Sequence, residues 1–141
     1  MKTQSEIAEA IAGQAHAGQF RYDGTPYIMH PARIVAKLRR SHFMDDADDV
    51  IAVAWLHDTF EDTPTKPIDL EKAGLSENII MAVIALTRTE GQSYEGYLQG
   101  VKMNPLAARV KFVDMMDNLS DHPTEKQIIK YCKGLLFLLE K

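Results

Sequence analysis

The sequence predicts an all-α bundle of roughly six or seven helices, in a single domain that spans residues 1–141. Three features of the chain indicate this fold class. Apolar residues recur at intervals of three and four along most of the chain, which is the spacing of one helix face. No stretch alternates apolar and polar residues in the manner of a strand. The chain also lacks a glycine-rich phosphate loop and an internal repeat, so α/β and repeat architectures are disfavoured.

The composition is that of a globular domain of ordinary size. With 141 residues, of which 45% are hydrophobic, the chain can bury a proper core. The formal charge of −4 argues against a protein that coats nucleic acid, and an anionic ligand would need a local cluster of positive charge. The first residues lack the apolar run of a signal peptide, and no segment is long enough to span a membrane. We therefore expect a cytoplasmic protein.

The first expected helix covers residues 5–17, where alanines and isoleucines form one stripe of helical period. Thr3 or Ser5 can cap its start. His16 falls near its end, and a packing or solvated role explains this histidine best.

A loop with turn residues follows at positions 18–26, and it contains Arg21. The second helix is expected to begin near Pro31, because proline suits the first turn of a helix. His30 therefore lies at a helix entrance. Taken alone, this histidine is better explained by a capping or surface role than by a functional one.

The third helix is expected from about Asp49 to Asp62, where Pro64 ends it. Aspartates crowd the residues before it, and they favour a helix start, since no calcium-binding loop accompanies them. On this helix four polar residues share less than half of the circumference, opposite the core face. They are His57, Asp58, Glu61 and Asp62.

These four residues form an electrostatically unfavourable group. The acids lie in the last turn, where the helix dipole disfavours carboxylates, and no lysine or arginine is among them. A bound cation would resolve the conflict. A solvated polar face explains the four residues about equally well, so the remainder of the chain has to decide.

The rest of the chain predicts further helices, which begin at Ser76, Ser93, Asn104-Pro105 and Thr124. The last one ends in an apolar run at 135–139, which can cover the domain or a second subunit, so a homo-oligomer is compatible with the sequence. The single cysteine, Cys132, excludes an intramolecular disulfide and fits a reducing compartment. Its apolar neighbours predict a buried, unreactive thiol.

A polar stripe of helical spacing lies on the helix that begins at Pro105, and it comprises Asp114, Asp117, Asn118 and Asp121. Solvent exposure would explain such a stripe. Asp114, however, stands within a hydrophobic stretch, and a buried acid there needs a partner. Together with His30, His57 and Asp58 it completes a set of two imidazoles and two carboxylates. This mixed set suits a divalent ion of intermediate hardness, such as Mn²⁺, Fe²⁺ or Zn²⁺.

The pattern H…HD…D in an all-helical chain resembles the HD phosphohydrolase superfamily. Longer strings are similar to the hydrolase domain of the RelA/SpoT family and its small stand-alone alarmone hydrolases. Those strings are A-H-A-G-Q-F-R at 15–21, G-T-P-Y-I-M-H-P at 24–31, W-L-H-D-T-F-E-D-T at 55–63 and V-K-F-V-D-M-M-D-N-L at 110–119. They occur in the order of the family and span nearly the whole chain.

The resemblance implies an HD-domain bundle in which His30, His57, Asp58 and Asp114 bind one metal ion, usually Mn²⁺. It further implies specific roles for four other residues. Glu61 and Asp62 would orient or activate a water molecule, Arg21 would line the nucleotide pocket, and Asn118 would help to hold the sugar–phosphate end.

The implied reaction is removal of the 3′-pyrophosphate from (p)ppGpp, which gives GDP or GTP and pyrophosphate. The substrate would be a small nucleotide, and the length of the chain implies a hydrolase without a synthetase domain.

Two positions depart from the family pattern. Tyr22 stands where a basic residue is common, and Met115-Met116-Asp117 replaces a sequence that usually carries positive charge. Both changes leave two alternatives open: an HD phosphohydrolase that acts on another nucleotide or phosphate ester, and a non-catalytic binding module. The second is disfavoured, because every metal-ligand position and both neighbouring acids are present.

Overall fold

The computed structural model describes residues 1–41 and 43–141, and within them it contains nine helical segments and no strand. The predicted all-α class is therefore confirmed. The segments are α1 (Gln4–Ala15), α2 (Met29–Arg39), α3 (Ala47–Leu56), α4 (Thr59–Asp62), α5 (Pro67–Lys72), α6 (Glu77–Ala85), α7 (Tyr94–Met103), α8 (Pro105–Leu119) and α9 (Glu125–Leu139). Seven are longer than two turns, while α4 and α5 are short. In the described part of the chain, no helix combines the length and apolar character needed to cross a membrane.

The helix starts follow from capping side chains. Thr3, Ser76, Ser93, Asn104 and Thr124 each accept a hydrogen bond from a backbone N–H group in the first turn of the helix that follows. Such a cap stabilises a helix by about 1 kcal/mol. The predicted starts are confirmed, and the first helix is capped by Thr3 and not by Ser5.

The expected third helix, from Asp49 to Asp62, is wrong in one respect, because the structure divides it at His57 and Asp58. α3 ends at Leu56, and a single turn, α4, begins at Thr59. At the break, two side chains donate hydrogen bonds to backbone carbonyls that backbone N–H groups would satisfy in a continuous helix. His57 Nδ1 donates to the carbonyl of Ala54 at 2.7 Å, and Thr59 Oγ1 donates to that of Leu56 at 2.8 Å. The break turns the His-Asp pair away from a regular helix face.

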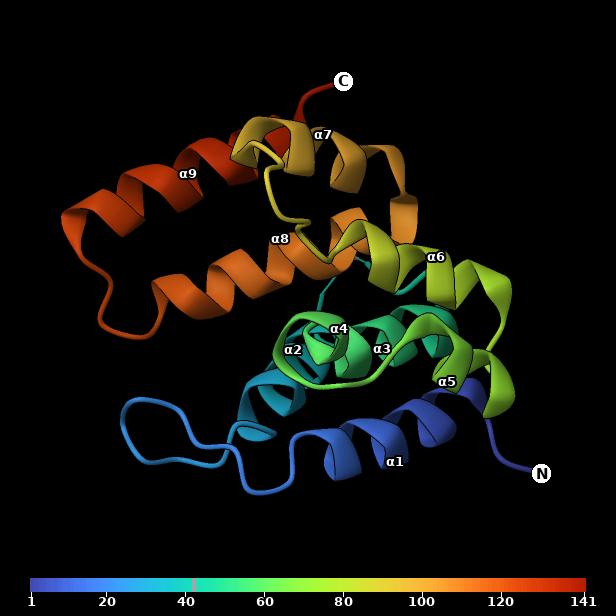
Figure 1. Cartoon of the computed structure of the whole chain (residues 1–141). Coiled ribbons are helices and arrows are strands. Elements are labelled where there is room, and N and C mark those ends of the chain that lie inside the picture. The colour runs from blue at the N-terminus through green and yellow to red at the C-terminus, as the bar shows by residue number, and fades with distance from the viewer. Residues whose placement is uncertain (42) are drawn as a thin grey trace.

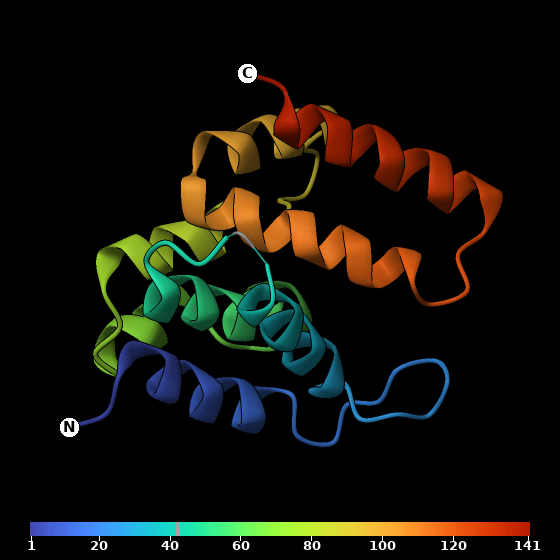
Figure 2. The same ribbon diagram turned by 180° about the vertical axis from the view of Figure 1, so that it is seen from behind.

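α3 lies at the centre of the bundle, where it contacts α1, α2, α6 and α8. Figures 1 and 2 show α1 on one side of it and α8 crossing on the other, with α7 and α9 forming an outer layer beyond α8. Asp48, in the first turn of α3, assists this packing, since its carboxylate accepts hydrogen bonds from the backbone of Gln4 and the hydroxyl of Ser5. Because α2, α3 and α8 meet in the middle, polar residues on their facing sides come together.

Leu38 on α2 is a fully buried member of the core. Truncation of a buried leucine removes apolar contacts and leaves a cavity. We expect Leu38→Ala to lower the free energy of unfolding by about 2–5 kcal/mol, measured by urea denaturation. Met103→Ala is the control, because Met103 is 84% exposed, and its change is expected to stay within about 0.5 kcal/mol. Equal effects for the two variants would contradict this account of the core.

The C-terminal helix corrects one expectation and leaves part of its apolar run in solvent. Cys132 is exposed, so the prediction of a buried thiol is wrong. α9 packs only one side onto α7 and α8, through residues such as Gly134 and Leu138, while Leu136 is 63% exposed. Apolar neighbours in the sequence therefore did not determine which side of this helix the cysteine occupies. His16, by contrast, is buried, as expected of a histidine that packs against its neighbours.

Candidate metal centre

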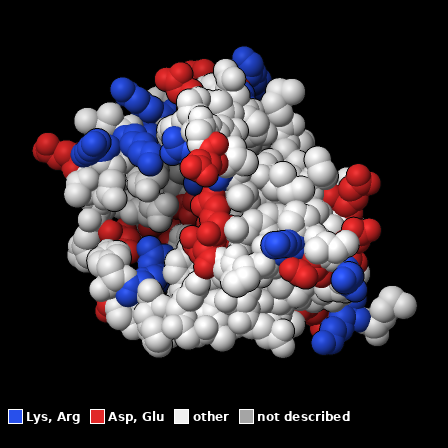
Figure 3. All heavy atoms as spheres, in the orientation of Figure 1, with Lys and Arg blue, Asp and Glu red and all other residues white. Residues whose placement is uncertain are grey.

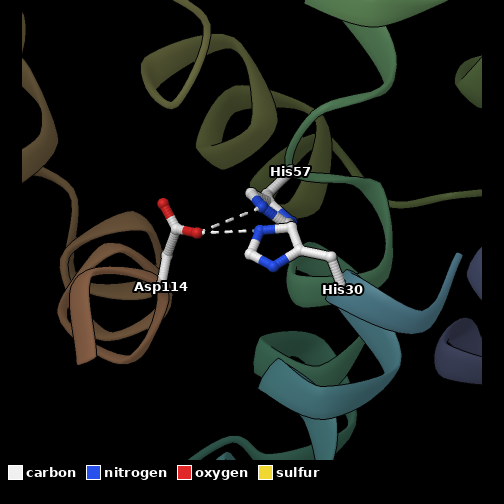
Figure 4. A group of neighbouring side chains, drawn as sticks. All are labelled: His30, His57 and Asp114. Carbon is white, nitrogen blue, oxygen red and sulfur yellow. Dashed lines mark ion pairs between the residues drawn. The ribbon is translucent and has the colours of Figure 1, made fainter. Parts of the chain in front are cut away.

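Three side chains from three helices converge at the middle of the bundle. His30 comes from the first turn of α2, His57 from the end of α3, and Asp114 from α8 (Figure 4). Asp114 Oδ1 lies 3.0 Å from His30 Nε2 and 3.7 Å from His57 Nε2. One ligand atom from each residue lies within 4.8 Å of the other two, and all three residues are buried. This is the arrangement expected of residues that share one metal ion.

Asp58 brings a fourth ligand type to the same point. Its Oδ2 atom lies 2.9 Å from His57 Nε2 and 3.8 Å from His30 Nε2. Two atoms that bind one ion at about 2.1 Å lie roughly 3.0 to 3.4 Å apart for the usual ligand angles. The separations among these side chains bracket that range, so the four predicted ligands fit a divalent cation.

The hydrogen bonds of His30 and His57 engage Nδ1 of each ring and leave Nε2 available to bind a metal ion. His57 Nδ1 faces the Ala54 carbonyl, which can only accept, and His30 Nδ1 faces Asp117 Oδ2 at 2.9 Å. Nδ1 therefore carries the proton in both rings, and Nε2 points toward the carboxylates. His57 Nε2 is buried and makes no hydrogen bond, although Asp58 is close. A cation would satisfy this atom.

The charges of the centre are consistent with a cation. Burial lowers the pKa of His57, but the carboxylates of Asp58 and Asp114 outweigh burial and hold it well above its usual value. The pKa of His30 is likewise raised: burial opposes the shift, and hydrogen bonds to Asp114 and Asp117 cause it. Without a metal, protons would thus occupy the space between the rings and the acids. A divalent ion can replace those protons, which is the usual linkage between metal binding and proton release.

Asp117 is a residue whose importance the sequence did not disclose, because it belongs to a stripe that solvent exposure would explain. It is 1% exposed. Besides His30, its carboxylate accepts hydrogen bonds from Arg33 Nε at 3.1 Å and Lys37 Nζ at 2.6 Å. Burial raises the pKa of Asp117, but these three donors together hold it well below its usual value. The ionised carboxylate fixes the orientation and the tautomer of His30.

We expect Asp117→Asn to weaken Mn²⁺ binding by about 10–100-fold, since an amide holds the His30 proton less firmly and leaves Arg33 and Lys37 without a counter-charge. Calorimetric titration with Mn²⁺ measures the change. Asp121→Asn is a matched control on the next turn, and its Mn²⁺ affinity should stay within about twofold of the parent. An unchanged affinity in Asp117→Asn would show that His30 needs no such support.

Lys111 Nζ donates a hydrogen bond to the second carboxylate oxygen of Asp114, Oδ2, at 3.0 Å. Burial lowers the pKa of this lysine, but the charge of Asp114 outweighs burial and raises it above its ordinary value. Oδ1 of Asp114 remains directed at the two histidines. Lys111 thereby orients Asp114, which lies one turn further along α8. In the sequence, Lys111 appeared only as a member of the string at 110–119, with no role of its own.

The two acids expected to serve the chemistry lie beside the centre and have different partners. Asp62 Oδ2 is 3.1 Å from the hydroxyl of Tyr27, which is also 2.5 Å from Asp58 Oδ2. Glu61 Oε1 accepts a hydrogen bond from the backbone N–H of Arg88 at 2.5 Å. Partial burial, and then the charge of Asp58, raise the pKa of both acids. Tyr27 is a further residue that sequence reasoning missed, although its position one turn before His30 is a signal for it.

A hollow of about 330 Å³ opens onto the centre. It is lined by Phe20, Arg21, Tyr22, Tyr27, His30, Asp58, Asp114 and Asn118. Both residues predicted to contact substrate, Arg21 and Asn118, thus lie on the same hollow as three of the predicted metal ligands. Tyr22 is there too, and its hydroxyl is 3.4 Å from Asp121.

An all-helical bundle with this His, His-Asp and Asp set resembles an HD-type domain. No family model matches the chain. The chain is, however, 44% identical over 54 residues to a guanosine-3′,5′-bis(diphosphate) 3′-pyrophosphohydrolase of Haemophilus influenzae. The aligned segment covers 38% of this chain and 8% of that protein. The protein of the same description from Aquifex aeolicus is 29% identical over 120 residues, or 79% of this chain and 17% of its own length.

Two further similarities agree with these. The bifunctional (p)ppGpp synthase/hydrolase SpoT of Escherichia coli is 38% identical over 68 residues, which is 46% of this chain and 9% of that protein. A solved structure, described as a metazoan ortholog of SpoT that hydrolyzes ppGpp, superposes with a TM-score of 0.79 at 22% identity, over 99% of this chain and 87% of that one. The resemblance predicted from the four strings is thereby confirmed: the chain is similar in sequence to RelA/SpoT-type hydrolases and shares the fold of a SpoT ortholog. It spans less than a fifth of the length of these curated relatives, at 8%, 17% and 9%.

Proposed function

We propose that residues 1–141 form a single HD hydrolase domain that removes the 3′-pyrophosphate from (p)ppGpp in the cytoplasm, with Mn²⁺ as its metal ion. The observation that carries the proposal is the four-residue centre of His30, His57, Asp58 and Asp114 beside a hollow that also exposes Arg21 and Asn118. The descriptions of the similar proteins support this substrate.

In this proposal, the four residues of the centre hold the ion, which supplies Lewis acidity toward a phosphoryl oxygen when it is bound. Glu61 accepts a proton from the attacking water, because its raised pKa makes it a better base than an ordinary glutamate. Tyr27 holds the carboxylates of Asp58 and Asp62 in place through its hydroxyl. Arg21 contacts the base or a phosphate, since a guanidinium group can do both.

A second candidate function keeps the chemistry and changes the substrate to another nucleotide or phosphate ester. The few positive charges around the hollow that contains Arg21 support this second candidate. Arg21, the one lysine or arginine among the described residues that line this hollow, lies 3.6 Å from Asp121, and Tyr22 adds no positive charge. A pocket with so little free positive charge is poorly suited to two diphosphate groups at once.

One assay separates these functions. The purified protein is incubated with Mn²⁺ and either ppGpp or a panel of other nucleotides, and released pyrophosphate and phosphate are measured. Release of pyrophosphate from ppGpp is the expected result. Turnover of other nucleotides with no reaction of ppGpp would favour the second function. Inertness toward all of them, with Mn²⁺ bound, would indicate a binding module.

A further inference from the structure

The cations near the metal centre fall into two groups. Most are paired with buried or half-buried acids: Arg33 and Lys37 with Asp117, Lys111 with Asp114, and Arg21 with Asp121. Arg88 and Lys130 differ, because within the described residues neither side chain forms an ion pair or a hydrogen bond with a carboxylate; the guanidinium group of Arg88 donates to the carbonyl of Gln92. Their positive charges are therefore available to a ligand.

Arg88 and Lys130 meet at one aromatic ring. Arg88 Cζ lies 5.7 Å from the centroid of Tyr94, and Lys130 Nζ lies 4.5 Å from the same centroid. The three residues come from separate parts of the chain: the segment between α6 and α7, the start of α7, and α9. The Tyr94 hydroxyl oxygen is buried and has no hydrogen-bond partner among the residues that the structure describes. A buried hydroxyl of this kind ordinarily has one.

This basic cluster, defined as Arg88, Tyr94 and Lys130, adjoins the metal centre through Glu61. The backbone N–H of Arg88 donates to the Glu61 carboxylate, and Arg88 lines an open hollow of about 570 Å³ together with Glu61 and Asp62. Tyr94 and Lys130 line a groove of about 390 Å³ between α7 and α9. In Figure 3, basic side chains gather over α9 beside a band of acidic side chains on the same face.

The electrostatics of the cluster indicate a missing counter-charge. Partial burial lowers the pKa of Lys130, and the neighbouring charges of Lys111, Arg88 and Lys126 lower it further. Cation–π contacts with Tyr94 account for the position of each cation. They do not account for two cations on one ring, or for a hydroxyl donor without an acceptor. An anion between the three groups would satisfy all of them.

We propose that Arg88, Lys130 and the Tyr94 hydroxyl form an anion subsite that binds a phosphate or diphosphate group of the substrate, away from the group that is cleaved. The proposal rests on the proposed function, since it supplies the positive charge that the hollow around Arg21 lacks. Arg88 offers a forked donor suited to phosphate oxygens, and Lys130 offers a point charge. The subsite thus selects substrates with a second phosphate-bearing end.

Binding of inorganic pyrophosphate tests the subsite without reference to turnover. The full chain, with and without Mn²⁺, is titrated with pyrophosphate by calorimetry at low salt. Lys130→Gln and Arg88→Gln are each expected to weaken the binding that persists without Mn²⁺ by roughly tenfold, and Tyr94→Phe by about threefold. Lys130→Arg should retain the parent affinity, because it keeps the charge.

The matched control is Lys102→Gln. Lys102 Nζ also lies over an aromatic ring, at 4.6 Å from the centroid of Phe137, but no second cation from the described part of the chain shares that ring. Its pyrophosphate affinity should equal that of the parent. Affinities within twofold of the parent for Lys130→Gln and Arg88→Gln, in variants with unchanged melting temperature, would overturn the subsite.

Kinetics with ppGpp separate the subsite from the proposed function. Lys130→Gln should raise KM by roughly tenfold and leave kcat nearly unchanged, because the lost contact lies away from the reacting bond. A parent protein that does not cleave ppGpp would disprove the proposed function, while the pyrophosphate titration would still decide on the subsite. A fall in kcat with unchanged KM would also overturn it.

Discussion

Asp58→Ala is expected to abolish Mn²⁺ binding and to reduce kcat/KM for the substrate by at least about a thousandfold, the effect of losing several kcal/mol of charge stabilisation. Burial raises the pKa of Asp58, but the neighbouring His57 outweighs burial and brings the pKa to about 2. The carboxylate is therefore ionised throughout the physiological range. Its Oδ2 atom lies at the point where both histidines direct Nε2.

The melting temperature provides a second measure of the same loss. A ligand that binds only the folded state stabilises it, so MnCl₂ should raise the melting temperature of the parent and leave that of Asp58→Ala unchanged. Asp45→Ala is the control, because Asp45 is an exposed aspartate outside the centre, and it should respond to MnCl₂ as the parent does. Full activity and a normal Mn²⁺ response in Asp58→Ala would mean that His30, His57 and Asp114 bind the ion without it.

The fold was predictable from local signals. Helical periodicity identified the helices, and residues such as Ser76 and Thr124 marked where two of them begin. These signals act within a few residues, so a single sequence contains them. The division of the third helix at His57 was not predictable in this way. It depends on side chains that bond to the carbonyls of Ala54 and Leu56 in place of the next backbone N–H groups.

The candidate metal ligands were predictable by residue type, whereas their supporting residues were not. Taken alone, His30 had an ordinary explanation, and it became a candidate because His57, Asp58 and Asp114 complete with it a set of residue types that suits a divalent ion. Asp117 is an ordinary member of a polar stripe until the tertiary structure brings Arg33 and Lys37 of α2 against it. These contacts join residues 84 and 80 positions apart, and nothing local to either segment specifies them. The exposure of Cys132 was unpredictable for the same reason, because contacts with α7 and α8 determine which side of α9 is buried.

Glu61→Gln is expected to lower kcat by about a hundredfold or more, the usual contribution of a general base, and to leave Mn²⁺ affinity unchanged. The substitution is well matched to the site. The side-chain oxygen of glutamine can still accept the hydrogen bond from the backbone of Arg88, so the position of the side chain is kept while its ability to take a proton is lost.

The pH dependence of kcat distinguishes a base from a residue that only positions others. Partial burial, and then the charge of Asp58, raise the pKa of Glu61 above the ordinary 4.5. The active form of a base is the deprotonated one, so the rate of the parent should fall as the pH drops through that raised pKa. In Glu61→Gln this acidic limb should be missing from the residual rate. Asp62→Asn is the comparison, because Asp62 contacts Tyr27 and not Arg88. If Asp62→Asn lost the limb and Glu61→Gln kept it, the base would be Asp62.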